Sequence, residues 1–350
     1  MKLKRFVHKS DDLDLDINFN DVSLIVGQNA VGKSRTIEAL DMFVNIILQR
    51  EDIGQGDSHS IHVDFIDENN EELSYSYTCE KGVVVSEYIH YNNVQRLIRD
   101  KKKTTLSDDV INPPSNKLVL HVRRDTVLYP FIEKIVNWAE NSYGLLFNEV
   151  EDLNSYDDNI LSTKESINSM FEKLKGNTIA KLLAQMKILG YFIEDISIKE
   201  IVKYTKTIIL HEKDIAGELL AHQLSTGMLR TLSLLIFVYN ISTLKQPQTL
   251  VIDDFCEGLD YNRATKLGKF LYDFCLEHNI QLITASNDSF LMDVVNLKYW
   301  ILLQREGSRI NVITQETQRK LFDHFKFTGL SNFDFFASDF IAGHPEDMQR

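Results

Sequence analysis

The sequence predicts an α/β fold in which a mixed sheet carries a phosphate-binding loop. Residues 27–34 read Gly-Gln-Asn-Ala-Val-Gly-Lys-Ser, a full match to G-x-x-x-x-G-K-[ST]. The apolar run at residues 22–26 predicts a buried strand before the loop, and apolar residues at helical spacing predict a helix over residues 33–49. Farther along, helical and strand patterns alternate from residue 226 to residue 314. Together these observations predict the α/β class.

The residue types in the loop explain why it would bind phosphate. Its glycines let consecutive backbone N–H groups close around a polyphosphate, and Lys33 reaches the outer phosphates. The Ser34 hydroxyl can ligate Mg²⁺ at the positive end of the following helix. A glycine-containing turn without a ligand is the alternative, which the flanking strand and helix disfavour. The residues expected to contact the nucleotide are Gly27, Gln28, Asn29, Ala30, Val31, Gly32, Lys33, Ser34 and Arg35.

Length and composition indicate a globular protein of one large domain or two ordinary ones. The chain has 350 residues, of which 43% are hydrophobic and 25% are charged. No segment approaches the roughly 20 apolar residues of a membrane span, and no leader pattern opens the chain. We therefore expect a cytoplasmic protein without a membrane partner. Its cysteines are widely spaced and predict neither a disulfide framework nor a zinc site: Cys79, Cys256 and Cys275.

The charge balance opposes long-range attraction to nucleic acid. Formal net charge is −13, from 51 acidic and 38 basic residues. A DNA contact would therefore be local, at one of two basic stretches. A run of lysines at a hairpin tip is usually a solvated loop, which is the alternative for the first stretch. The stretches are Arg96, Arg99 and Lys101–Lys103, and then Arg123 with Arg124.

The first half of the chain predicts short, hairpin-like strands around the loop. Residues 100–116 form a polar break that contains three lysines and two prolines. Strands are expected at residues 2–7, 13–19, 61–65, 73–78, 83–90 and 117–121.

The middle of the chain predicts an inserted helical segment. Apolar residues recur at helical spacing between residues 131 and 187, interrupted by an acidic stretch at residues 149–159. Strands then follow at residues 192–198, 206–210, 249–252, 281–284, 299–305 and 309–314, with helices at residues 226–242 and 262–277. Residues 325–341 are unusually aromatic, and they are either core or an element that docks a partner.

The strand at residues 249–252 ends in two carboxylates, Asp253 and Asp254. Paired acids at a strand end are typical of a Walker B motif, in which the first acid holds Mg²⁺ through water and the second orients the attacking water. We assign these roles to Asp253 and Asp254 respectively. An ordinary acidic turn is the alternative.

A second segment points to the same machinery. Residues 224–230 read Leu-Ser-Thr-Gly-Met-Leu-Arg and open an apolar helix. A serine hydroxyl and a glycine N–H at a helix N-terminus make an anion site, and a plain helix cap is the alternative. The candidates here are Ser225 and Gly227. Residues 257–260, Glu-Gly-Leu-Asp, follow the paired acids and complete the order of motifs.

In this order of motifs the sequence resembles the ABC-type ATPase heads of SMC, RecF and OLD proteins. There LSxGxxR is the usual signature, and hhhhD[DE]…GLD carries Walker B and the D-loop. The resemblance is specific over residues 1–50 and 205–315. It implies a single ABC-type domain over residues 1–350, a mixed sheet with a P-loop core plus an antiparallel β subdomain. Its expected parts are residues 1–130 (P-loop lobe), 131–205 (helical insertion), 206–315 (signature and Walker B lobe) and 316–350 (aromatic tail).

The resemblance also implies a mechanism with ATP and Mg²⁺. In that family two heads dimerise head to tail with ATP between them. Ser225 and Gly227 of one subunit would thus contact the γ-phosphate held by Lys33 and Ser34 of the other. The catalytic residues would be Lys33 and Asp254, with Glu257 as the next candidate base. Asp260 of the D-loop would lie at the same nucleotide.

Three departures from the family pattern bear on activity. Asp254 stands where the family usually has Glu, and the missing methylene would draw the carboxylate back by about 1.5 Å, which predicts slow hydrolysis. No switch histidine follows residues 281–284, where Ser286 and Asn287 are the polar candidates that remain. No glutamine occupies a Q-loop position after residues 117–121.

These features favour an ATPase that acts on another protein. No heptad pattern is sustained long enough for coiled-coil arms. About 35 residues after Thr314 are too few for a nuclease domain of the OLD kind. We therefore expect a regulatory ATPase, similar to those of anti-phage and toxin–effector systems, that dimerises on ATP and controls a separate effector. The alternatives are a RecF-like DNA repair ATPase that binds DNA directly, and a scaffold that hydrolyses ATP weakly or not at all.

Overall fold

The computed structural model describes residues 1–54, 58–146, 166–202, 205–220, 223–326 and 330–337. Its contacts divide the chain into two compact units, each described here by itself. Unit 1 comprises residues 1–142, 247–249 and 298–319, and unit 2 comprises residues 143–246, 250–297 and 320–350. The acidic stretch expected at residues 149–159 lies outside the described residues.

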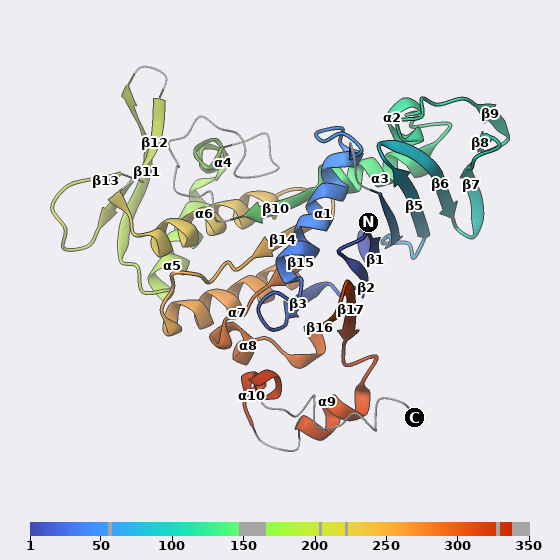
Figure 1. The fold of residues 1–350 in the computed structure, drawn as a ribbon. Coiled ribbons are helices and arrows are strands. Elements are labelled where there is room, and N and C mark those ends of the chain that lie inside the picture. The colour runs from blue at the N-terminus through green and yellow to red at the C-terminus, as the bar shows by residue number, and fades with distance from the viewer. Residues whose placement is uncertain (55–57, 147–165, 203–204, 221–222, 327–329, 338–350) are drawn as a thin grey trace. The chain divides into compact units, whose positions relative to one another are not determined.

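Unit 1 is built on a mixed sheet (Figure 1). Its strand order is β3-β16-β17-β2-β1-β4-β5-β6-β7-β8-β9, with β3 parallel to β16, β17 parallel to β2, and antiparallel pairing elsewhere. The strands are β1 (Lys2–Lys9), β2 (Asp14–Asn18), β3 (Val22–Val26), β4 (His59–Ile66), β5 (Glu72–Glu80), β6 (Val83–Tyr91), β7 (Val94–Arg99), β8 (Thr104–Leu106), β9 (Asp109–Ile111), β16 (Trp300–Glu306) and β17 (Arg309–Ile313). The helices are α1 (Lys33–Ile47), α2 (Val119–Val122) and α3 (Pro130–Glu140).

Burial patterns explain these elements. All five residues of β3 are buried, whereas β4 alternates buried and half-buried residues, as a strand with one face on the core does. The turn between β6 and β7 places Asn92 at φ 49° and Asn93 at φ 61°, and asparagine tolerates this left-handed backbone better than most residues. Phe43 of α1 packs against Trp138 of α3, with ring centroids 5.9 Å apart.

The polar break at residues 100–116 is only partly a break, because β8 and β9 lie within it. The strand expected at residues 117–121 is wrong: α2 occupies Val119–Val122. A short apolar run does not distinguish a strand from a buried helical turn. A tertiary contact stabilises this helical turn: the Glu87 carboxylate accepts the N–H of Val119 at 2.9 and 3.0 Å.

Unit 2 contains the remaining elements (Figure 1). In it β11 and β12 form a long antiparallel hairpin, to which β13 adds a short third strand. Its strands are β10 (Ser142–Leu146), β11 (Ile193–Val202), β12 (Thr205–Glu212), β13 (Leu219–Leu220), β14 (Gln248–Asp253) and β15 (Ile280–Ala285); β10 and β14 begin within the residues of unit 1. The helices are α4 (Ile167–Lys173), α5 (Gly176–Ile188), α6 (Thr226–Ile241), α7 (Tyr261–Glu277), α8 (Ser289–Val294), α9 (Arg319–Lys326) and α10 (Asn332–Ala337).

Helix α6 is apolar on nearly every side, and its residues from Gly227 to Tyr239 are all buried. A helix of this kind belongs inside a protein rather than on its surface. Within the 131–205 region that was expected to be helical, α3 lies in unit 1, and α4, α5 and the strands of the hairpin lie in unit 2. Strand β10 was not expected from the sequence.

The aromatic C-terminal segment contributes to a core. Phe322, Phe325 and Phe335 are at most 2% exposed, and the ring of Phe335 lies 4.8 Å from that of Phe322 and 4.7 Å from that of Phe325. Asn332 donates to the carbonyls of Met292 and Val295, which ties α10 to the end of α8. These residues therefore serve packing. Phe327 and Phe340 lie outside the described residues.

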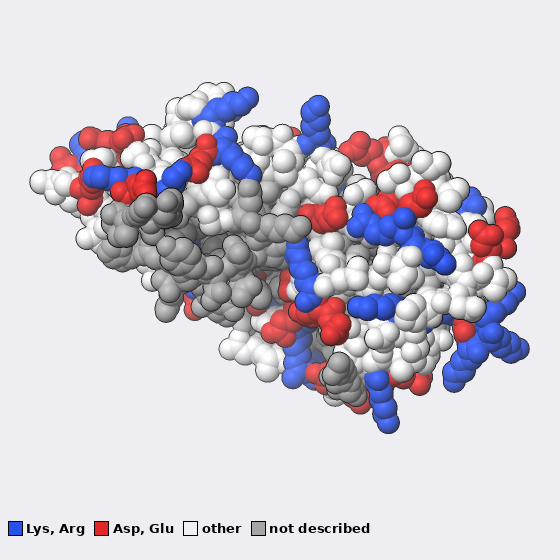
Figure 2. All heavy atoms as spheres, turned by 90° about the horizontal axis from the view of Figure 1, so that it is seen from above, with Lys and Arg blue, Asp and Glu red and all other residues white. Residues whose placement is uncertain are grey.

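The three cysteines are buried free thiols. No helix among the described residues is long and apolar enough to cross a membrane. Acidic and basic side chains are interspersed over the described part of the face drawn in Figure 2.

Candidate functional site

The predicted phosphate-binding loop joins β3 to α1 in unit 1. Gly27 lies so close to β16 that a Cβ atom on it would meet the Leu303 carbonyl oxygen at 2.9 Å. Gly32 has a φ of 116°, which side-chain-bearing residues rarely adopt. Both glycines are thus required by the course of the backbone. Gln28, Asn29 and Ala30 are exposed at the tip of the loop.

Lys33 folds back over its own loop. Its Nζ donates to the carbonyl oxygens of Gly27 at 3.0 Å and Gln28 at 3.2 Å, and the residue is only 7% exposed. Val31 also donates its N–H to Gln28, at 3.4 Å. The ammonium group is therefore held beside the loop backbone, where a phosphate would approach it.

The N-terminus of α1 is open toward an anion. No side chain caps it, and its first turn contains no acidic residue. The first N–H groups of a helix carry a partial positive charge and need acceptors from outside the helix. Ser34 is exposed in this first turn. These residues fit a phosphate group with Mg²⁺, because they supply uncapped N–H donors, an ammonium group and a hydroxyl.

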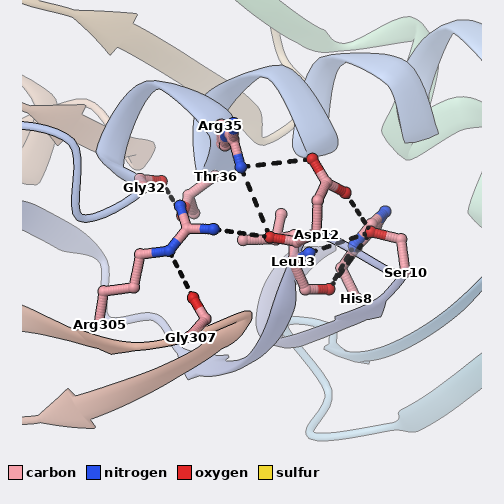
Figure 3. A network of polar contacts seen from close by, with 9 residues as sticks. All are labelled: His8, Ser10, Asp12, Leu13, Gly32, Arg35, Thr36, Arg305 and Gly307. Carbon is pink, nitrogen blue, oxygen red and sulfur yellow. Dashed lines mark hydrogen bonds and ion pairs between the residues drawn. The ribbon is translucent and has the colours of Figure 1, made fainter.

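Arg35 belongs to a polar network beside the loop, which the sequence did not predict (Figure 3). Its Nη1 lies 3.3 Å from the Asp12 carboxylate. Arg305 donates to the Asp12 carbonyl at 3.1 Å and to the Gly307 carbonyl at 2.7 Å. A hydrogen bond from the Ser10 hydroxyl lowers the pKa of Asp12, with a smaller contribution from Arg35. The network joins the β1–β2 turn, α1 and the β16–β17 turn.

The paired acids lie in unit 2, at the end of β14. Asp253 is the last residue of the strand, and Asp254 follows with a φ of 43°. The Asp254 N–H donates to the Ala285 carbonyl of β15 at 3.0 Å, which fixes this backbone. Asp and Asn are the side-chain-bearing residues that enter the left-handed region most readily. The backbone therefore gives a physical reason for Asp, rather than the family's Glu, at this position.

The signature segment forms the N-terminus of α6. Ser225 is the cap residue, and its Oγ accepts the N–H of Met228 at 3.3 Å. A Cβ atom on Gly227 would meet the Gly258 carbonyl oxygen at 2.8 Å. Gly227 is thus required by a contact inside unit 2, a reason that the motif alone did not reveal.

Arg230 and Glu257 form an ion pair that links these two segments. Arg230 Nη1 lies 3.0 Å from Glu257 Oε2 and also donates to the Glu257 carbonyl at 3.1 Å. The arginine is the last residue of the LSxGxxR pattern, so the motif contained the signal for it, although no role had been assigned to it. Glu257, the next candidate base, is engaged in this pair.

The remaining candidates occupy turns of unit 2. Asp260 caps α7 by accepting the N–H of Arg263 at 3.1 Å, and that hydrogen bond lowers the pKa of Asp260. Ser286 is 1% exposed, and its Oγ accepts the N–H of Asp288 at 3.0 Å. Asn287 is exposed beside it.

The predicted residues therefore form two groups. Unit 1 brings residues 27–35 together, and unit 2 brings residues 225–230 together with residues 257–258. A separate groove of about 780 Å³ in unit 1 contains none of the loop residues. It is lined by side chains of β1, β2 and β17 that include Arg5, Lys9, Asp14 and Arg309.

Comparisons with known proteins identify a family and a fold for this chain. Residues 22–293 match the family model described as "AAA domain, putative AbiEii toxin, Type IV TA system". No curated protein matches the chain.

Solved structures with a similar fold are heads of SMC proteins. The "SMC head domain from Thermotoga maritima" is 14% identical with a TM-score of 0.51, covering 90% of this chain and 99% of that one. The "SmcHead bound to the C-winged helix domain of ScpA" is 11% identical with a TM-score of 0.57, covering 91% and 100%. The head "bound to the C-terminal domain of ScpA derived from Pyrococcus furiosus" is 11% identical with a TM-score of 0.52, covering 93% and 99%. The chain therefore belongs to this AAA-domain family and has the fold of SMC head domains.

Proposed function

We propose that this protein binds and hydrolyses ATP with Mg²⁺, dimerises head to tail when ATP is bound, and thereby controls a separate effector protein. The observation that carries the nucleotide part is the uncapped N-terminus of α1 with Lys33 and Ser34 in its first turn. Backbone N–H groups, an ammonium group and a hydroxyl all belong to this segment, and together they are the donor set that a polyphosphate requires.

In this proposal each residue has a separate task. The N–H groups of residues 28–34 and the Lys33 ammonium group bind the β- and γ-phosphates. Mg²⁺, when bound, neutralises charge on the phosphates; Ser34 would hold it directly and Asp253 through water. Asp254 would orient the attacking water and accept its proton. Ser225 and Gly227 of the partner subunit would close the site over the γ-phosphate.

Two observations support control of another protein. The family description names a toxin of a Type IV toxin–antitoxin system, which is our reason to expect a second component beside this chain. Two similar SMC heads were solved with a domain of the protein ScpA, so a head of this fold can hold a protein partner. We propose a partner of that general kind here, with a role in anti-phage defence.

The geometry of the basic stretches makes direct DNA binding the weaker candidate. Arg99 is 6% exposed and donates to the Lys117 carbonyl at 2.6 Å, and Arg124 forms two hydrogen bonds with Glu133 at 2.6 and 2.9 Å. Both arginines are thus occupied within the fold. Half-buried Arg96, exposed Arg123 and the exposed lysines at residues 101–103 remain. Asp100 holds the turn of the lysines by accepting two of their backbone N–H groups.

The test is calorimetric titration of the purified chain with ATP and Mg²⁺, together with a phosphate-release assay and light scattering with and without ATP. Binding, turnover and an ATP-dependent doubling of mass are expected. Absence of ATP binding would overturn the proposal at its first step. Binding without turnover would instead favour the alternative of an ATP-dependent scaffold, for which the shortened acid at Asp254 is the specific observation.

A further inference from the structure

Two contacts inside unit 2 join the signature helix to the turn that follows the paired acids. At the first, Gly227 packs against the Gly258 carbonyl with no room for a Cβ atom. At the second, Arg230 donates to the carboxylate of Glu257 at 3.0 Å and to the carbonyl oxygen of Glu257 at 3.1 Å. Both contacts lie within the first two turns of α6, close to its anion-binding end.

The side chain of Arg230 is largely buried. It is 10% exposed, whereas that of Glu257 is 63% exposed. A cation buried to this degree needs hydrogen-bond acceptors, and leaving it without them is costly. The Glu257 carbonyl is one such acceptor, so the position of the 254–258 turn and the position of α6 are fixed together.

The linkage continues to Asp254. The N–H of Glu257 donates to the Asp254 carbonyl at 3.1 Å, and the N–H of Asp254 donates to Ala285 at 3.0 Å. A shift of α6 would therefore pull on the turn whose first residue is the assigned catalytic acid. Packed elements joined by short polar contacts transmit small shifts because they are not freely deformable.

We propose that Arg230 is a positioning residue that couples the anion-binding end of α6 to the Asp254 carboxylate. When Ser225 of one subunit binds a phosphate of the ATP held by its partner, the position of Asp254 in that first subunit is fixed. Asp254 then acts on the ATP bound to the phosphate-binding loop of its own subunit. ATP bound in one composite site of the dimer thereby promotes hydrolysis in the other. This inference rests on the proposed ATPase function.

The test uses Arg230→Gln, Arg230→Lys, Glu257→Ala and Glu257→Gln in the full chain. ATP affinity is measured by calorimetry, and kcat and KM by phosphate release. Lys199→Gln is the matched control, because it removes an ion pair of unit 2, to Glu218 at 2.8 Å, far outside the motifs in sequence. Thermal unfolding of each variant shows that it is folded.

We expect Arg230→Gln to lower kcat by about tenfold, the loss typical of one charge-assisted hydrogen bond, with KM and ATP affinity unchanged. Arg230→Lys, which retains one donor, should recover part of the rate. Glu257→Ala removes an exposed side chain, keeps the carbonyl that also accepts from Arg230, and should lower kcat in the same way. Glu257→Gln should retain more of the rate than Glu257→Ala does, because its amide oxygen still accepts a hydrogen bond from Arg230. Lys199→Gln should match wild type.

Other results overturn the inference. Wild-type kcat in both Arg230→Gln and Glu257→Ala removes the coupling role while leaving the ATPase proposal intact. Loss of turnover in Glu257→Gln equal to that in Glu257→Ala assigns Glu257 to proton transfer instead. If the wild-type chain binds no ATP, it is the proposed function that fails, and the wild-type titration alone reveals it.

Discussion

Lys33 donates from its Nζ to the carbonyl oxygen of Gly27 at 3.0 Å, six residues before it in the chain. The ammonium group of the loop lysine is thus held by backbone carbonyl groups at the place where a phosphate would bind. This arrangement prepares the cation at the point of binding and spares the cost of ordering a free side chain.

Lys33→Ala should therefore abolish ATP binding, because it removes the side-chain cation of the loop and leaves the backbone N–H groups alone to hold the phosphates. The measurement is calorimetric titration with ATP. Lys4→Ala, an exposed lysine of β1, is the control and should bind as wild type does. Equal affinities in wild type and Lys33→Ala would contradict the assignment of the loop.

Asp254→Asn should leave ATP binding intact, stop turnover and trap the dimer. Asn accepts a φ of 43° as readily as Asp does, so the variant removes the charge without disturbing the backbone. Asp254→Ala is the informative comparison, since Ala should lose about 1 kcal/mol of stability in this conformation. Turnover at the wild-type rate in Asp254→Asn would mean that another group acts as the base.

The elements that the sequence predicts correctly are those whose signal lies in neighbouring residues. Helix α1 and strands β14 and β15 confirm the expected elements to within two residues at each end, because continuous or periodic apolar residues encode them. Helix α2 was mistaken for a strand because its apolar run is short, and the Glu87 carboxylate that accepts the Val119 N–H lies 32 residues away in the chain. No local pattern signals such a contact.

The same distinction holds within the candidate site. The loop at residues 27–34 and the cap at Ser225 each belong to a short continuous motif, so the sequence alone identified them. The contact of Arg305 with Asp12 spans 293 residues, and that of Arg230 with Glu257 spans 27. Each pair becomes visible only when the fold brings its two segments together.

Burial raises the pKa of Glu87 to about 7 from its ordinary value of 4.5. The folded state therefore binds this proton more tightly than the unfolded chain does. The resulting stabilisation is full below pH 4.5 and is lost as the pH rises through 7, by about 3 kcal/mol at most. Urea unfolding of wild type and Glu87→Gln between pH 4.5 and 8 measures it. In Glu87→Gln the free energy of unfolding should not fall with pH in this way. Parallel plots of that free energy against pH for the two proteins would contradict the raised pKa of Glu87.

DNA binding should be weak and sensitive to salt. Any affinity held by phosphate contacts falls by about one decade per decade of salt for each phosphate neutralised. With Arg99 buried and the exposed Arg124 ion-paired to Glu133, duplex and single-stranded DNA should show no binding that survives physiological salt in an anisotropy titration. Replacing the lysines at residues 101–103 by Ala should then change nothing. Tight binding that those substitutions weaken would favour the DNA repair alternative.

Assembly in trans separates an ABC-type dimer from a P-loop protein that works alone. Ser225→Arg places a bulky cation where the partner's γ-phosphate should dock, while the Lys33 site of the same subunit is unchanged. The variant should bind ATP normally but fail to dimerise or hydrolyse it. It also loses the hydrogen bond from Met228 to the Ser225 hydroxyl, worth about 1 kcal/mol. Ser166→Arg is the matched control, because it removes the corresponding cap of α4, at 3.3 Å, and should remain active.

Mixing Ser225→Arg with Lys33→Ala protein should restore activity. One composite site is then complete, since it combines the intact loop of the first protein with the intact signature of the second. Up to half of the wild-type activity should return if that site fires without the other. Less should return if Asp254 of the Ser225→Arg subunit needs its own signature segment, as the coupling through Arg230 implies. Neither variant should hydrolyse ATP when assayed alone. Wild-type turnover by Ser225→Arg protein on its own would reduce residues 224–230 to a capped helix. A mixture that stays inactive, although both proteins are folded and Ser225→Arg binds ATP, would mean that the two sites of the dimer must act together.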